Sequence, residues 1–144
     1  MKKVFRILAV MFATAFISGY AFAQEAEVPK FLDGTVRVTA EEVINLVDKY
    51  DNLVIIDARK KSDVAKGYIE GAISLPNTET NAASLAKVIP SKSTPILIYC
   101  NGIRCHRSVD SAGVAVASGY THVYWFRGGI QEWEAKGLPV VHPK

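Results

Sequence analysis

Residues 96–108 read ILIYCNGIRCHRS. The first four form a short apolar run, fenced by Pro95 before it and Cys100 after it, which is typical of a strand buried on both faces. From Arg107 to Ser118, apolar side chains recur at helical intervals. A cysteine therefore stands where a buried strand ends, and a glycine-containing loop leads from it into the start of a helix.

This loop has the chemistry of an anion site. Backbone N–H groups of a loop and of a helix start can converge on one point and give it a partial positive charge. A thiolate of Cys100 would be stabilised there, which predicts that its pKa lies below the free value of about 8.5. Arg104, Arg107 and His106 are candidates for further positive charge. Gly102 suits a tight loop that needs positive φ or a close backbone approach.

Similar runs occur on both sides of the cysteine loop. The segments 53–56 and 122–125 are short, β-rich and bounded by turn residues, and strands near 36–38 and 72–75 complete the set. Helical patterns lie between them. The prediction is an α/β fold with a central, mostly parallel five-stranded sheet and helices on both faces. The expected helices are 40–49, 81–88, 107–118 and 130–136.

The N-terminus has the layout of a secretory signal peptide. Three basic residues precede an apolar stretch that runs from Ile7 to about Ala23 and ends in Ala21-Phe22-Ala23. An uncleaved membrane anchor is the alternative, which the interruption at Ser18-Gly19-Tyr20 disfavours. We expect a signal peptide over 1–23, a tail over 24–34 and one domain over 35–144. The mature protein would then be periplasmic or secreted, with no membrane contact after cleavage.

The charge balance excludes some partners. The chain has 17 Lys+Arg and 14 Asp+Glu, and removal of Lys2, Lys3 and Arg6 with the signal leaves 14 of each. A neutral domain offers no electrostatic argument for nucleic acid or anionic lipid. The chain has two cysteines, Cys100 and Cys105. In an oxidising compartment such a pair can form a disulfide, stay as two thiols, or cycle between these states.

Four further segments lie in the order and at the distances found in the rhodanese family, and together with the cysteine loop they resemble it. The segment 54–59 is similar to its strand ending in Asp-x-Arg, and 67–76 to its Gly-His-Ile-x-Gly-Ala signature. The segment 124–133 resembles its closing Gly-Gly-x-x-x-Trp, followed by 137–140. The resemblance covers about Thr39 to Val140.

The resemblance implies sulfur transfer. In such enzymes a cysteine thiolate takes the outer sulfur of thiosulfate or a similar small anion as a persulfide and passes it to cyanide or a thiol. It implies Cys100 as the nucleophile, with Asp57 and Arg59 ordering the loop or meeting the substrate. No cofactor is implied, and Cys100, Cys105 and His106 lack the fourth ligand of a tetrahedral metal site. The implied anion-binding loop consists of Asn101, Gly102, Ile103, Arg104, Cys105, His106 and Arg107.

The chain also departs from the family pattern. Cys105 stands where a typical member has arginine or lysine, and Arg107-Ser108 follows two residues later; Tyr68 replaces the signature histidine. The second cysteine, the longer loop and the fact that fold does not dictate activity leave other functions open. One is a thiol-disulfide redox protein with Cys105 as resolving thiol and a periplasmic redox partner. The others are a non-catalytic binding module and a phosphatase or arsenate reductase.

Overall fold

The computed structural model describes residues 26–144, so the predicted signal peptide lies outside the described residues. A five-stranded sheet forms its centre, with strand order β1-β5-β4-β2-β3 and every neighbouring pair parallel. The predicted α/β fold with a five-stranded sheet is confirmed, and the sheet is parallel throughout. The strands are β1 (Thr35–Arg37), β2 (Val54–Asp57), β3 (Ile73–Ser74), β4 (Ile96–Tyr99) and β5 (Val123–Phe126).

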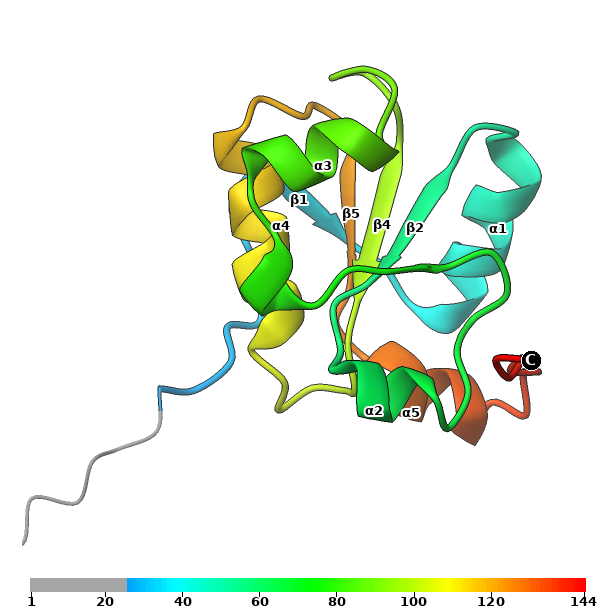
Figure 1. Ribbon diagram of the computed structural model, residues 1–144. Helices are drawn as coiled ribbons and strands as arrows, with labels where there is room; N and C mark the ends of the chain where they lie inside the picture. Colours follow the sequence, from blue (N-terminus) through cyan, green and yellow to red (C-terminus); the bar gives the residue numbers. More distant parts are fainter. Residues whose placement is uncertain (1–25) are drawn as a thin grey trace, which may run out of the picture.

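Helices cover both faces of this sheet, with α3 and α4 on one side and α1 and α5 on the other (Figure 1). Two short elements were not predicted, α2 and a 3₁₀ turn over Asn77–Glu79, because so few residues show no periodicity. Among residues 26–144, no helix has the length and apolarity needed to span a membrane. The helices are α1 (Ala40–Lys49), α2 (Lys61–Val64), α3 (Ala82–Val88), α4 (Arg107–Ala117) and α5 (Gly129–Ala135).

The position of β4 in the middle of the sheet explains why its sequence is apolar at every residue. Ile96 and Ile98 join the core beneath α3 and α4, whereas Leu97 and Tyr99 join the core beneath α1 and α5. All four side chains are fully buried. Because successive side chains of a strand point to opposite faces, a strand covered on both sides must be apolar at every position.

Helix α1 begins with the capping box that the sequence predicts. The Thr39 hydroxyl oxygen accepts a hydrogen bond from the Glu42 N–H, and the Glu42 carboxylate accepts one from the Thr39 N–H at 2.7 Å. Two N–H groups without helical partners are thereby satisfied.

Parallel pairing places the carboxyl ends of β2, β4 and β5 at one edge of the sheet. The residues that follow these strands are Ala58-Arg59, Cys100 and Arg127-Gly128, and α2 and α5 lie at this same end (Figure 1). Parallel α/β sheets form their ligand sites at this edge. The tail residues also reach it, because Arg127 donates hydrogen bonds to the carbonyls of Val28 and Pro29.

Candidate active site: a two-cysteine loop

Cys100 lies beneath the loop. It is the first residue after β4, and its exposed fraction is 1%. Its Sγ lies 3.2 Å from the carbonyl oxygen of Cys105 and 3.2 Å from Oγ of Ser108. The indole N–H of Trp125 donates to the same Ser108 Oγ at 3.0 Å, which leaves the Ser108 hydrogen free to point at the sulfur. Neither Ser108 nor Trp125 was predicted as a site residue, although the Arg-Ser pair that opens α4 could have indicated Ser108.

The base of the loop is fixed to the start of α5. The carbonyl of Cys100 accepts from the Ile130 N–H at 3.0 Å, and that of Asn101 accepts from the Gln131 N–H at 2.9 Å. The close approach of the loop to α5 requires a glycine at position 129. Gly129 has φ +57°, and a Cβ there would lie 2.2 Å from the Cys100 carbonyl oxygen. The glycine pair after β5 therefore gives the loop its support, since first-turn N–H groups of α5 have no helical partner.

A Gly129→Ala variant tests this support. We expect it to lose about 2–4 kcal/mol of unfolding free energy, because the added Cβ meets backbone atoms and adopts a left-handed conformation. Urea denaturation gives the value. The matched control is Gly113→Ala within α4, where nothing lies within 4 Å of an added Cβ. The control should be stabilised by about 0.5–1 kcal/mol, and equal effects of the two substitutions would refute the proposed support.

The surroundings of Gly102 differ from those of Gly129. Its φ is not positive, and a Cβ there would lie 2.2 Å from Oε1 of Gln131. The positive-φ interpretation is therefore wrong, and the close contact is with a side chain and not with another part of the backbone. The neighbour is the flexible end of a side chain from α5, which sequence reasoning did not bring to the site.

A cavity of ≈ 380 Å³ opens on the outer side of the loop. Cys105 and Arg107 face it, but Cys100 does not line it. Ile103 is 56% exposed and lines a neighbouring cavity of ≈ 760 Å³ together with the tail residues Ala26 to Val28. The first cavity thus brings together most of the predicted anion-binding loop. Its lining residues are Asn101, Gly102, Arg104, Cys105, His106, Arg107 and Gln131.

Cys105 is the more acidic of the two thiols. The hydrogen bond from Cys100 and the N–H groups of Asn101 and Arg107 lower the pKa of Cys105 to about 5, against the opposing effect of burial. The guanidinium of Arg107 contributes as well, with Nη1 at 3.8 Å from Sγ.

The pKa of Cys100 is raised, by its hydrogen bond with Cys105 and by burial, so the predicted lowering of its pKa is wrong for this arrangement. The physical reason is the path of the loop. It turns back through the bond from the Cys105 N–H to the Gly102 carbonyl, and the N–H groups of Asn101 and Arg107 stabilise the sulfur of Cys105.

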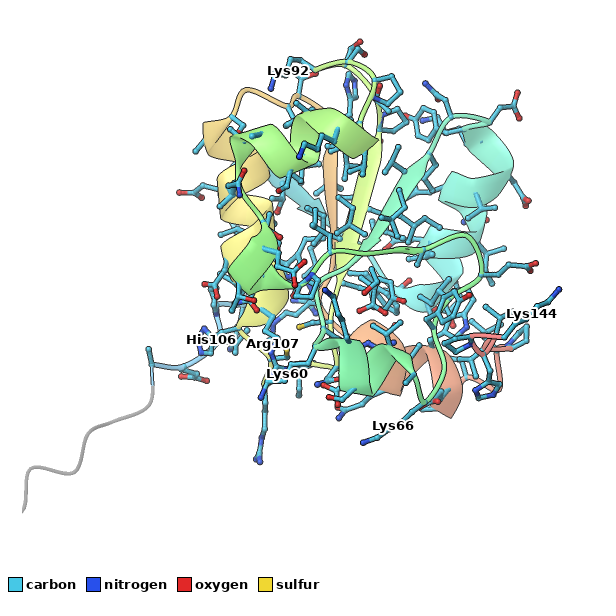
Figure 2. The ribbon with its side chains drawn as sticks, in the orientation of Figure 1. Lys60, Lys66, Lys92, His106, Arg107 and Lys144 are labelled. Carbon is cyan, nitrogen blue, oxygen red and sulfur yellow. The ribbon has the colours of Figure 1, made fainter. Side chains whose placement is uncertain are left out.

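Arg107 lies close to both Cys105 and Asp63. Its Nη1 is 3.8 Å from Sγ of Cys105 and 3.9 Å from Oδ2 of Asp63 in α2. The same Oδ2 of Asp63 lies 3.5 Å from Nδ2 of Asn101. Arg107 is at the end of α4 that faces α2, with His106 beside it (Figure 2). Asp63 was not predicted as a site residue, because only the fold brings α2 to the loop.

The other two basic residues of the loop also lie at its surface. The ring of His106 forms a hydrogen bond with the Ala26 carbonyl, and Arg104 lines both cavities.

Asp57 and Arg59 do not line the cavity; they form a buried ion pair behind it. Arg59 donates to both carboxylate oxygens of Asp57, the shortest contact being 2.6 Å, and to the Gly67 carbonyl at 2.7 Å. Tyr99, the residue before Cys100, donates to Asp57 at 2.7 Å. Burial and the Asp57 carboxylate raise the pKa of Tyr99, so the phenol keeps its proton. Of the two roles expected for this pair, the geometry favours ordering the site.

The pKa of Cys105 predicts its reactivity. Since the thiolate is the reacting form, alkylation of Cys105 by iodoacetamide should stay nearly constant as the pH falls from about 8 to about 6, with a midpoint near 5. An ordinary thiol with a pKa of about 8.5 would instead lose roughly tenfold in rate for each pH unit. Peptide mapping after timed alkylation measures the profile. Arg107→Gln should move the midpoint upward, and a wild-type midpoint near 8.5 would contradict this description of the loop.

The parallel sheet, with a cysteine loop between its central strand and the following helix, defines a small α/β domain that carries a thiol at the ligand-binding edge of its sheet. The Rhodanese-like domain model matches residues 39–136, and the chain belongs to that family.

The chain is similar to several known proteins. The chain is similar to the uncharacterized protein YibN of Escherichia coli K12, at 29% identity over 80% of this chain and 79% of YibN. It is also similar to a sulfurtransferase of Allochromatium vinosum, at 26% identity over 74% of this chain and 95% of that protein. Among solved structures, thiosulfate sulfurtransferase from Pseudomonas aeruginosa is similar at 28% identity and a TM-score of 0.62, over 76% of this chain and 21% of that chain. Distant relatives of this chain are thus named sulfurtransferases.

Proposed function

We propose that this protein is a sulfurtransferase that moves sulfane sulfur from thiosulfate or a similar small anion to a thiol or cyanide through a persulfide on Cys100. The observation that carries the proposal is the position of Cys100 at the carboxyl end of β4, beneath a loop whose amides and Arg107 face a cavity. The named sulfurtransferases among the relatives support the same chemistry.

The loop suits a dianionic donor. Arg104 and Arg107 line the cavity, and backbone N–H groups of Asn101 and Arg107 already stabilise a negative sulfur there. Positive groups that hold an anion near a thiolate both concentrate the donor and stabilise charge that develops during transfer. Cys105 lines the cavity and Cys100 does not, so the proposed attack requires the Cys105 side chain to move when the donor enters.

The atoms and charges of the sulfur transfer balance without a cofactor. The two thiols share one negative charge, so the Cys100 proton passes to Cys105 as Cys100 attacks. A bond forms between Cys100 Sγ and the outer sulfur of thiosulfate, and the sulfur–sulfur bond of thiosulfate breaks. Sulfite leaves with the electron pair of that bond. A thiophilic acceptor then takes the outer sulfur and returns Cys100 to its thiolate.

Intact-mass analysis before and after thiosulfate, with sulfite measured in parallel, tests the proposal. We expect a gain of one sulfur atom on part of the protein, one sulfite per sulfur transferred, and loss of the added mass on reduction. Absence of both products with several sulfane donors would refute the proposal. Turnover of an aryl phosphate would instead favour the phosphatase interpretation, and partner capture by a Cys100→Ala variant would favour the binding module.

We propose in addition that the protein works outside the cytoplasm after cleavage of residues 1–23. The support is the sequence of the leader itself, with its basic start and its Ala21-Phe22-Ala23 end. Terminal sequencing of the exported protein should begin at Gln24. Recovery of the intact leader on the protein in the cytoplasmic fraction would contradict this location.

A further inference from the structure

The two cysteines of the chain are held against one another. Cys100 Sγ lies 3.2 Å from the carbonyl oxygen of Cys105, and the interaction between the two side chains raises the pKa of Cys100 and lowers that of Cys105. One sulfur is buried and the other lines the cavity. Sulfur transfer through Cys100 uses this second, acidic thiol only to take up the proton of Cys100.

We propose that Cys105 is the thiolate that discharges the Cys100 persulfide, releasing hydrosulfide and closing a disulfide between Cys100 and Cys105. This inference rests on the proposed function, since it needs a persulfide on Cys100. It adds a reductive step, in which the sulfane sulfur leaves as sulfide and need not pass to an external acceptor.

The step balances in atoms and electrons. Cys105 first returns to the persulfide the proton that it took up during sulfur transfer. The Cys105 thiolate then attacks Cys100 Sγ of the protonated persulfide, a Cys105–Cys100 bond forms, and the bond from Cys100 Sγ to the outer sulfur breaks. The outer sulfur leaves with that electron pair as hydrosulfide, having gained two electrons, and each cysteine sulfur has lost one. An external dithiol reductant then restores both thiols by thiol–disulfide exchange.

The surroundings of Cys105 favour it as the attacking group. The N–H groups of Asn101 and Arg107 and the Arg107 guanidinium favour its anionic form, and Asp63 lies 3.9 Å from that guanidinium. Thiolates, not thiols, attack disulfide-type sulfur. Cys105 also lines the cavity while Cys100 does not, so an external dithiol reaches the disulfide from the Cys105 side.

The experiment compares wild type with Cys105→Ser after thiosulfate treatment in the absence of other thiols. For the wild type we expect up to one hydrosulfide per chain and a product lighter by two hydrogen atoms, with Cys100 and Cys105 joined in a peptide map. For Cys105→Ser we expect sulfite release and a lasting gain of one sulfur, with hydrosulfide yield reduced at least tenfold. Added dithiothreitol should release sulfide from the Cys105→Ser persulfide and should return the wild-type disulfide to two thiols.

The control variant carries a serine far from the loop. Lys87 is exposed on α3, and the Lys87→Ser protein should discharge its Cys100 persulfide as the wild type does. A persulfide equally long-lived in wild type and in Cys105→Ser would overturn the role of Cys105 while leaving the proposed function intact. Failure of both proteins to gain sulfur or release sulfite would instead count against the proposed function, and with it against this inference.

Discussion

Replacement of Cys100 by serine is expected to abolish sulfur uptake and to lower thiosulfate:cyanide transfer by about 10⁴-fold or more, the usual consequence of removing a nucleophile. A serine hydroxyl can keep the hydrogen bonds to the Cys105 carbonyl and Ser108, so the fold should persist. A hydroxyl at this site does not ionise near neutral pH and cannot form a persulfide. Thiocyanate production and intact mass after thiosulfate measure the two effects.

The result with Cys100→Ser also tests which cysteine carries the sulfur. Cys105 remains in this variant, facing the cavity with a lowered pKa. A gain of one sulfur on Cys105 at the wild-type rate would contradict the assignment of Cys100 and make Cys105 the carrier. Circular dichroism of the variant distinguishes loss of chemistry from loss of fold.

Replacement of Asp57 by alanine is expected to produce the largest loss of stability, about 3–5 kcal/mol, because it leaves a buried arginine without its partner. Asp57 is fully buried, and it accepts hydrogen bonds from the Arg59 N–H, the Arg59 guanidinium and the Tyr99 hydroxyl. The loss should lower Tm by roughly 10–20 °C for a domain of this size. Calorimetry measures the shift, and sulfur transfer should fall as well because Tyr99 directly precedes Cys100.

The matched control removes one partner of an exposed ion pair. Lys61 and Glu79 are 3.0 Å apart, and both side chains are more than half exposed. Lys61→Ala should cost less than about 1 kcal/mol, since water screens such a pair. If Asp57→Ala were no more destabilising than Lys61→Ala, the buried network would not support the end of β4 as described.

Particular elements show why most of the fold could be predicted from the sequence. The run Ile96–Tyr99 is apolar at every position because the strand is covered on both faces, and its predicted limits agree with β4. The capping box at Thr39 fixes the start of α1 in the same way. Helix α2, with four residues, carries no such periodic signal and was missed.

The site was predicted less completely, for a physical reason. The loop residues follow one another in the chain, so their common location follows from a single strand–loop–helix unit. Asp63 and Gln131 come from α2 and α5, and only the parallel order of the strands brings them to this loop. The buried bond from Trp125 to Ser108 likewise depends on the packing of β5 against α4.

The sequence by itself determined that an apolar strand delivers Cys100 to a loop before a helix, because local periodicity and strand burial are properties of neighbouring residues. Tertiary structure alone decided which sulfur faces the cavity and bears the negative charge. That choice depends on burial, on the convergence of N–H groups, and on Arg107 held by Asp63, and none of these is a property of the loop considered alone. A thiol acquires its pKa from everything that surrounds it in space.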